Sequence, residues 1–225
     1  MKQLLKQTIA KLGYQIQGTR YIPRQLLDPH RLRKVEFDDV VCRRMFEVGS
    51  GFTFIQVGVF DGVTKDPLRK YIQQCDWQGV LVEPQPRAAS QLRELYRDNH
   101  RIVVLQAALD QKFGQRTLYT VESNHAPVWA GGLASFQRET IIKHATLIPG
   151  LDGMIKENVV EGIPFDAVLN YLPSARLDLL QIDTVGADSY SLSLFPFVRV
   201  LPAIIHWEIK QVRKSQRESC LDRLS

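Results

Sequence analysis

The hydrophobic pattern of residues 52–109 predicts strands and helices in alternation. Three short apolar runs have the length and composition of buried strands, and they occupy residues 52–58, 79–84 and 101–109. Between them, apolar side chains recur at helical spacing, first after Asp66–Pro67 and then over residues 86–99. Aspartate caps exposed N–H groups and proline suits the first helical turn, so Asp66–Pro67 predicts a helix start.

The pattern loosens from Asp110 to about Pro164 and then becomes regular again. The looser part predicts a strand at 114–122 and a helix at 135–148, with Ile141, Ile142 and Ala145 facing inward. Residues 149–164 predict a loop that could hold a short strand at 156–162. Beyond it, the pattern predicts helices at 165–172 and 187–195, a buried strand at 177–186 and a final strand at 202–209. Continuous apolar strands crossed by helices are typical of a parallel sheet covered on both faces. We therefore expect an α/β domain over residues 51–225.

The first 50 residues predict a basic, partly helical leader that packs on this domain. Leu4, Leu5, Ile9 and Leu12 fit one face of a helix. Lysines at positions 2, 6 and 11 interrupt any apolar core that a signal peptide would need. The stripe is short and lacks aromatic residues, which favours docking on the domain over binding to a membrane surface.

Composition and charge exclude several classes of function. The chain has 225 residues, 44% of them hydrophobic, and a formal charge of +5 without a basic stripe interleaved with aromatics, so no nucleic-acid partner is expected. No apolar run approaches the roughly 20 residues of a membrane span. Cys42, Cys75 and Cys220 show no metal-ligand spacing and leave a single disulfide open, and a reduced, cytoplasmic chain is the simpler interpretation. The histidines show no ligand spacing either, so no metal site is expected.

The glycine loop after the first strand indicates the kind of ligand. It reads Gly58-Val59-Phe60-Asp61-Gly62, with a bulky Phe60 where a dinucleotide-binding loop has its middle glycine. Asp61 would add a carboxylate near a pyrophosphate, at a cost of about 1–4 kcal/mol. A nicotinamide or flavin oxidoreductase is therefore disfavoured. S-adenosylmethionine has no phosphate and carries a sulfonium and an ammonium. Glu83 ends the second strand, where a carboxylate can accept hydrogen bonds from both ribose hydroxyls.

Five segments in this order resemble the FkbM family of S-adenosylmethionine-dependent methyltransferases. They read FIQVGVFDGVTKDPL, WQGVLVEPQP, LASF, LDLLQIDTVGADSYSL and PAIIHWEIK. The resemblance implies a Rossmann-like class I methyltransferase fold and methylation of a hydroxyl on a sugar, glycan, glycolipid or secondary metabolite. It further implies that the cofactor contacts come from the ends of the first three strands: Gln56, Gly58, Phe60, Asp61 and Gly62 for methionine and adenosine, Glu83 for the ribose, and Pro84, Gln85, Ala107 and Ala108 for the adenine.

Three departures from the family pattern bear on activity. Gln56 stands where many class I members have an acidic residue for the methionine ammonium, so a roughly tenfold weaker affinity is expected if nothing compensates. Val185 replaces the acidic residue of a D-x-E-G motif. Only 15 residues follow Lys210, which suggests a sheet shortened at its C-terminus.

Catalysis of methyl transfer to oxygen needs an aligned hydroxyl and a group that takes its proton. By the resemblance, Asp183 faces the transferring methyl group. His206 and Glu208 lie on the same side of the last strand, and His206 is the predicted general base. A partly buried histidine with a structural role is the alternative.

The prediction is therefore an S-adenosylmethionine-dependent O-methyltransferase with a small-molecule or glycan hydroxyl acceptor. The alternative is a non-catalytic or vestigial S-adenosyl-binding protein, favoured by Val185 and the short C-terminus. The sequence predicts neither the identity of the acceptor nor the oligomeric state.

Overall fold

A computed structural model describes residues 36–123 and 125–207. The chain divides into two compact units, residues 1–43 and 44–225, and α3 (Phe37–Val48) spans the division. The predicted domain boundary after residue 50 stays a prediction. The N-terminal stripe, Cys220, Glu208 and the predicted shortening after Lys210 lie outside the described residues.

The larger unit is built on a five-stranded sheet whose neighbouring strands are all parallel. The order is β3-β2-β1-β8-β9, formed by β1 (Thr53–Val57), β2 (Gln78–Val82), β3 (Ile102–Leu105), β8 (Leu179–Ile182) and β9 (Ile204–Trp207). In register, Ile55 of β1 lies between Val80 of β2 and Leu180 of β8. The chain runs outward from β1 to β3 on one side and resumes at β8 on the other, so strand order reverses between β1 and β8.

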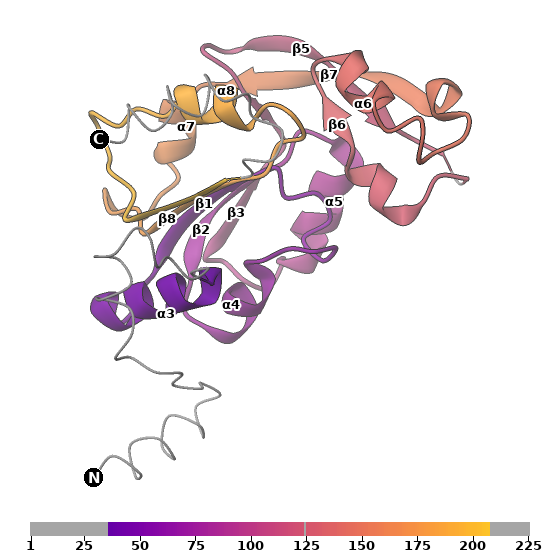
Figure 1. Ribbon diagram of the computed structural model, residues 1–225. Helices are drawn as coiled ribbons and strands as arrows, with labels where there is room; N and C mark the ends of the chain where they lie inside the picture. Colours follow the sequence, from indigo (N-terminus) through magenta and orange to yellow (C-terminus); the bar gives the residue numbers. More distant parts are fainter. Residues whose placement is uncertain (1–35, 124, 208–225) are drawn as a thin grey trace, which may run out of the picture. The chain divides into compact units, whose positions relative to one another are not determined.

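Helices cover both faces of this sheet, as predicted (Figure 1). On one face, Ile55 and Val57 belong to a core shared with α7 (Phe165–Leu169) and α8 (Asp188–Ser193). On the other, Trp77 contacts Phe54 of β1 and stacks on Tyr71 of α4 (Arg69–Gln74), with ring centroids 4.8 Å apart. The helix α5 (Pro86–Leu95) packs beside β3. Because these strands are buried on both faces, their sequences are mostly apolar instead of alternating between apolar and polar residues.

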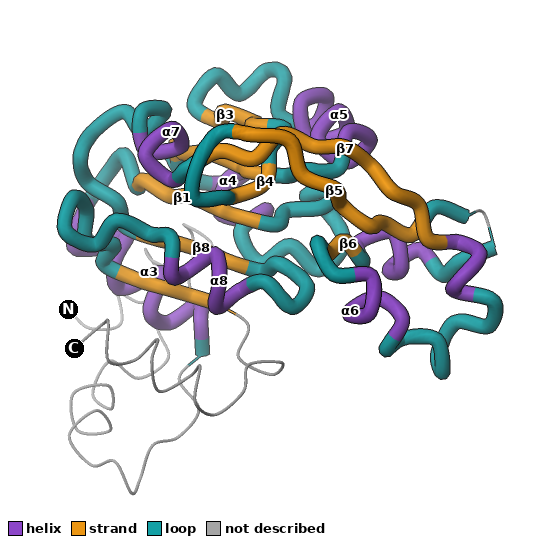
Figure 2. Tube along the Cα trace, turned by 90° about the horizontal axis from the view of Figure 1, so that it is seen from above, coloured by secondary structure: helices purple, strands orange, loops and turns teal. Residues whose placement is uncertain are grey.

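The loosely patterned part of the chain forms a second, mixed sheet, which Figure 2 shows from above. Its order is β4-β7-β5-β6, with β4 (Ala108–Leu109), β5 (Gly114–Val121), β6 (Ala134–Ser135) and β7 (Ile155–Ile163). The longest pairing is antiparallel, between β5 and β7. Short 3-10 helices at Val128–Gly132 and Leu151–Met154 and the helix α6 (Arg138–Ile142) complete it.

Several predicted elements need correction. The apolar run 101–109 is two strands in different sheets, separated at Gln106 and Ala107. Residues 155–163, assigned mainly to a loop, form the nine-residue β7. The helix predicted at 135–148 is only the five-residue α6, and Ala145 is exposed rather than inward. The helix predicted at Asp66 begins as α4 at Arg69, although the Asp66 carboxylate does accept the Leu68 N–H at 2.8 Å. Within the described ranges, no helix has the length and apolar character needed to cross a membrane.

Candidate functional site

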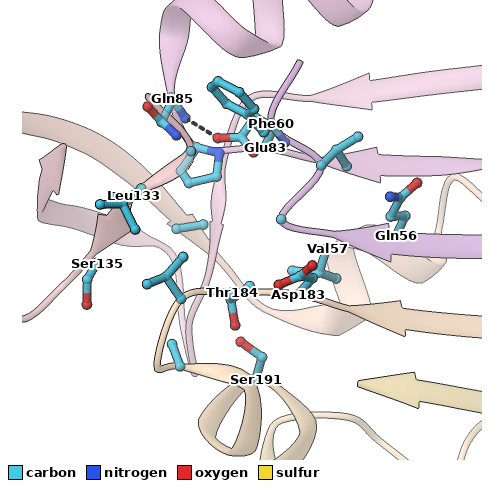
Figure 3. Close-up of a pocket in the computed structure, with 18 of the residues that line it drawn as sticks. Gln56, Val57, Phe60, Glu83, Gln85, Leu133, Ser135, Asp183, Thr184 and Ser191 are labelled. Atoms are coloured by element: carbon cyan, nitrogen blue, oxygen red, sulfur yellow. Dashed lines mark hydrogen bonds between the residues drawn. The ribbon is translucent and has the colours of Figure 1, made fainter. Parts of the chain in front are cut away.

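A cavity of about 280 Å³ opens at the carboxyl ends of β1, β2 and β8 (Figure 3). Open α/β sheets bind ligands where strand order reverses, because the loops on either side of that point diverge and leave a crevice. The loops after β1 and β8 flank this point here, with Gly58 on one side and Asp183 on the other. Residues from the second sheet, among them Leu118, Leu133 and Ser135, line the cavity as well.

The loop after β1 has a backbone that its glycines make possible. Gly58 has φ +76°, and a Cβ there would lie 2.0 Å from the carbonyl oxygen of Asp183. Gly62 has φ +67°, and a Cβ there would lie 2.6 Å from the Leu92 side chain. Phe60 also has a positive φ, +56°, which is uncommon for a bulky residue. The strand can therefore turn sharply over the end of β8 and bring the loop to the cavity.

Glu83 holds this loop to the one after β2. It is 3% exposed, and its two carboxylate oxygens accept the backbone N–H groups of Phe60 at 2.7 Å and Gln85 at 2.9 Å. Burial raises the pKa of Glu83, while these N–H donors act in the opposite direction. The backbone of Val59 and the Gln85 side chain act on the same carboxylate.

Gln56 and Asp66 form a polar pair in the lining of the same cavity. The Gln56 side chain is buried on β1 and donates from Nε2 to Asp66 Oδ1 at 3.0 Å. Gln56 Oε1 and Asp66 Oδ2 are buried and have no hydrogen-bond partner among the described residues. Burial raises the pKa of Asp66 against the opposing effect of the Leu68 N–H and the Gln56 amide. In Figure 3, Gln56 stands at the side of the cavity away from Leu133 and Ser135.

Asp61 and Gly62, both predicted cofactor contacts, are not among the cavity-lining residues. The Asp61 carboxylate accepts the N–H groups of Val63 and Thr64 and the Thr64 hydroxyl, at 2.7–2.9 Å. Burial alone would raise the pKa of Asp61, but these three donors hold it below its usual value. Its carboxylate therefore stabilises its own loop, and contact with a ligand stays a prediction.

The predicted catalytic residues are placed differently from one another. Asp183 lines the cavity at the end of β8 and is exposed. His206 is not among the residues that line the cavity. Its Nδ1 contacts Oε1 of Gln181, and Gln181 does line the cavity. Burial lowers the pKa of His206. Glu208 lies outside the described residues. The structure thus brings Asp183 to the cavity and places His206 behind Gln181.

The remaining predicted contacts gather around the cavity. Gln56, Gly58, Phe60, Glu83, Pro84, Gln85, Ala107 and Ala108 all line it. The Phe60 ring lies close to Gly131, in the 3-10 helix that precedes β6 of the second sheet. A Cβ at Gly131 would be 3.2 Å from Cζ of Phe60. The sequence predicted only a helix cap for Asp66, and it predicted no role in the site for Gln181, Thr184 or Ser191. All four residues line the cavity. The spacing of Asp66 from the glycine loop gave no signal of its pairing with Gln56.

Within the described part of the chain, no three His, Cys, Asp or Glu side chains gather as a metal site would require. Metal independence stays a prediction.

A parallel sheet with this strand order, a glycine turn after β1 and an acidic residue after β2 define a Rossmann-like class of fold. The methyltransferase FkbM domain family matches residues 56–224, about three quarters of the chain, so the chain belongs to this family and contains a methyltransferase domain. Neither the curated proteins nor the solved structures gave a match.

Proposed function

We propose that the protein is an S-adenosylmethionine-dependent methyltransferase that methylates a hydroxyl group of a sugar, glycan or secondary metabolite. The observation that carries the proposal is Glu83, a buried carboxylate at the carboxyl end of β2 whose oxygens accept N–H groups from the loops after β1 and β2. A carboxylate in this position can accept hydrogen bonds from a ribose diol, and among the described lining residues Phe60 stands where a phosphate-binding loop has its middle glycine.

The family resemblance assigns the residues that would hold the cofactor, and the lining of the cavity supports most of these assignments. Glu83 would bind the ribose, with Pro84, Gln85, Ala107 and Ala108 around the adenine. Gln56, Gly58 and Phe60 would surround the methionine part, while Asp61 and Gly62 support the loop that carries them. When bound, S-adenosylmethionine supplies a methyl group made electrophilic by a sulfonium.

Asp183 is the residue we assign to the acceptor. It lies at the mouth of the cavity on the end of β8, where its carboxylate can accept the proton of an acceptor hydroxyl. His206 would act through Gln181, by orienting the amide that lines the cavity. Trp129, Leu133 and Phe136 give the second-sheet side of the cavity an apolar and aromatic wall that suits the face of a sugar ring.

Isothermal titration with S-adenosylhomocysteine, with NAD as the control ligand, tests the cofactor. We expect S-adenosylhomocysteine alone to bind, and Glu83→Gln to weaken binding about tenfold, since a charge-assisted hydrogen bond is replaced by a neutral one. The matched control is Glu94→Gln, because Glu94 is exposed and pairs with Arg97 on the surface. Melting curves verify that both variants are folded. Absence of binding by folded wild-type protein would overturn the proposal.

A cofactor-binding protein without turnover is the second candidate. It is favoured by Val185, which lines the cavity where the family pattern has an acidic residue, and by the position of His206 outside the lining. Transfer of a labelled methyl group to any member of a hydroxyl-acceptor panel, lost in Asp183→Asn, would exclude it.

A further inference from the structure

We infer that Asp66, together with Gln56, forms the binding site for the ammonium group of the cofactor's methionine part. The inference rests on the proposed function and assigns a subsite within it. The carboxylate comes from the loop before α4, ten residues after the β1 position where an acidic residue is expected and Gln56 is found.

The two side chains are held as a unit by one hydrogen bond. Gln56 Nε2 and the Leu68 N–H both donate to Asp66 Oδ1, at 3.0 and 2.8 Å. This arrangement fixes the Gln56 amide with its donor on the carboxylate, and it leaves one oxygen of each side chain as the remaining acceptor. The pair therefore presents two acceptors and one negative charge.

Both remaining acceptors lack donors. Gln56 Oε1 and Asp66 Oδ2 are buried, so bulk water does not supply the missing hydrogen bonds, and no described residue does. A buried acceptor without a donor is costly, and a buried carboxylate oxygen more so. Most native buried polar atoms are satisfied, so an unsatisfied pair in the wall of a cavity indicates a ligand group.

A cationic group that donates more than one hydrogen bond would satisfy both acceptors and would add to the charge that Arg69 already places near Asp66. An ammonium has three N–H donors and one positive charge, which matches two acceptors and one carboxylate. Gln56 and Asp66 both line the cavity, so an ammonium bound there would lie beside the pair. Asp66 thus supplies the charge that Gln56 lacks.

Three ligands separate the ammonium from the rest of the cofactor. S-adenosylhomocysteine carries it, the deamino analogue of S-adenosylhomocysteine replaces it with hydrogen, and 5′-methylthioadenosine lacks the whole amino-acid part. Titration of Asp66→Asn should show S-adenosylhomocysteine affinity reduced about 10- to 100-fold, with both other ligands within about twofold of wild type. Asp76→Asn is the matched control, because Asp76 is exposed and pairs with Arg101 away from the cavity.

Moving the charge provides a rescue. The double variant Gln56→Glu with Asp66→Asn exchanges the acid and the amide within the pair, and we expect it to recover most of the lost affinity for S-adenosylhomocysteine. A variant that merely disturbed the loop would lose all three ligands together and would not be rescued.

The outcomes separate this inference from the proposed function. If wild type binds 5′-methylthioadenosine and S-adenosylhomocysteine but Asp66→Asn retains full affinity for both, the ammonium assignment is overturned and the cofactor assignment stands. An equal loss for all three ligands also overturns it. If folded wild type binds none of the three, the proposed function fails and this inference fails with it.

Discussion

An aspartate with a buried carboxylate oxygen lies at each end of the central sheet. The two carboxylates differ in how many of their oxygens accept hydrogen bonds. At the amino end, Asp178 is 0% exposed and accepts from Arg44, from Arg176 and from the Thr53 backbone N–H, all at 2.8–3.1 Å. At the carboxyl end, Asp66 receives its hydrogen bonds on one oxygen, and the other is buried without a partner among the described residues. A saturated carboxylate stabilises the fold, whereas an unsaturated one beside a cavity is available to a ligand.

The largest expected effect is at the amino end. Asp178→Ala removes the acceptor of the buried Thr53 N–H and the shared partner of two arginines, so we expect the free energy of unfolding to fall by about 3–5 kcal/mol. Urea denaturation measures it. Asp178→Asn keeps an oxygen for the Thr53 N–H and should lose less. Equal losses for the two variants would show that the charge pairing, rather than the backbone acceptor, dominates at this end.

The second effect is the pH dependence of ligand affinity at the carboxyl end. Burial raises the pKa of Asp66, so its carboxylate gains a proton and loses its charge as the pH falls through that raised value. Below it, we expect the affinity ratio of S-adenosylhomocysteine to 5′-methylthioadenosine to fall, by up to about tenfold per pH unit.

Two neighbouring groups act on Asp66 through their charge or polarity, Arg69 and Tyr96. The Arg69 guanidinium opposes the rise in the pKa of Asp66, and burial raises the pKa of Tyr96 to about 12, so Tyr96 stays neutral over the titrated range. In the proposed function Glu83 binds the ribose that both ligands share, so its protonation would cancel in the ratio. Titrations from pH 8 to about pH 3.5 measure the ratio, because the raised pKa lies above the ordinary value of 3.8, and a flat profile in wild type would contradict the prediction.

Much of the central sheet was predictable because its strands are buried on both faces. The segments around Ile55, Val80 and Leu180 are short, buried and mostly apolar, with Gln56 and Gln181 as polar exceptions, and this pattern has few alternatives. The second sheet was harder, since β7 exposes one face. Its Glu157 and Glu161 are exposed while Val160 and Ile163 are buried, a mixture that resembles a loop when read without its partner β5.

The candidate site divides in the same way. The positions of Gly58 and Glu83 follow from strand order, because loops at the carboxyl ends of neighbouring parallel strands meet. The pairing of Gln56 with Asp66 depends on a loop that turns through positive φ at Phe60 and Lys65, neither of which is a glycine. No local preference of those residues predicts such a turn. The sequence therefore predicts only a helix cap for Asp66.

A smaller effect concerns the loop itself. Asp61→Ala removes the acceptor for two backbone N–H groups in a partly exposed turn, and we expect a loss of about 1 kcal/mol in unfolding free energy at pH 7. Because the pKa of Asp61 is held below its usual value, its contribution is complete above about pH 4 and is lost as the pH falls through the folded value. Denaturation at pH 7 and pH 3 should therefore show the difference from wild type shrinking. A constant difference would mean that the carboxylate charge has no part in it.

The smallest expected effect is the stability of ligand-free Asp66→Asn, and it tests the comparison most directly. The asparagine keeps an oxygen for the Leu68 N–H and the Gln56 amide, and it removes a buried charge that no described donor satisfies on its second oxygen. We expect unfolding free energy within about 0.5 kcal/mol of wild type, or higher, because residues kept for ligand binding often cost stability. Saturating S-adenosylhomocysteine should then stabilise wild type more than the variant, since a tighter ligand shifts unfolding further. A loss as large as that of Asp178→Ala, with or without ligand, would show that Asp66 is held for the fold, and the distinction between the two ends of the sheet would disappear.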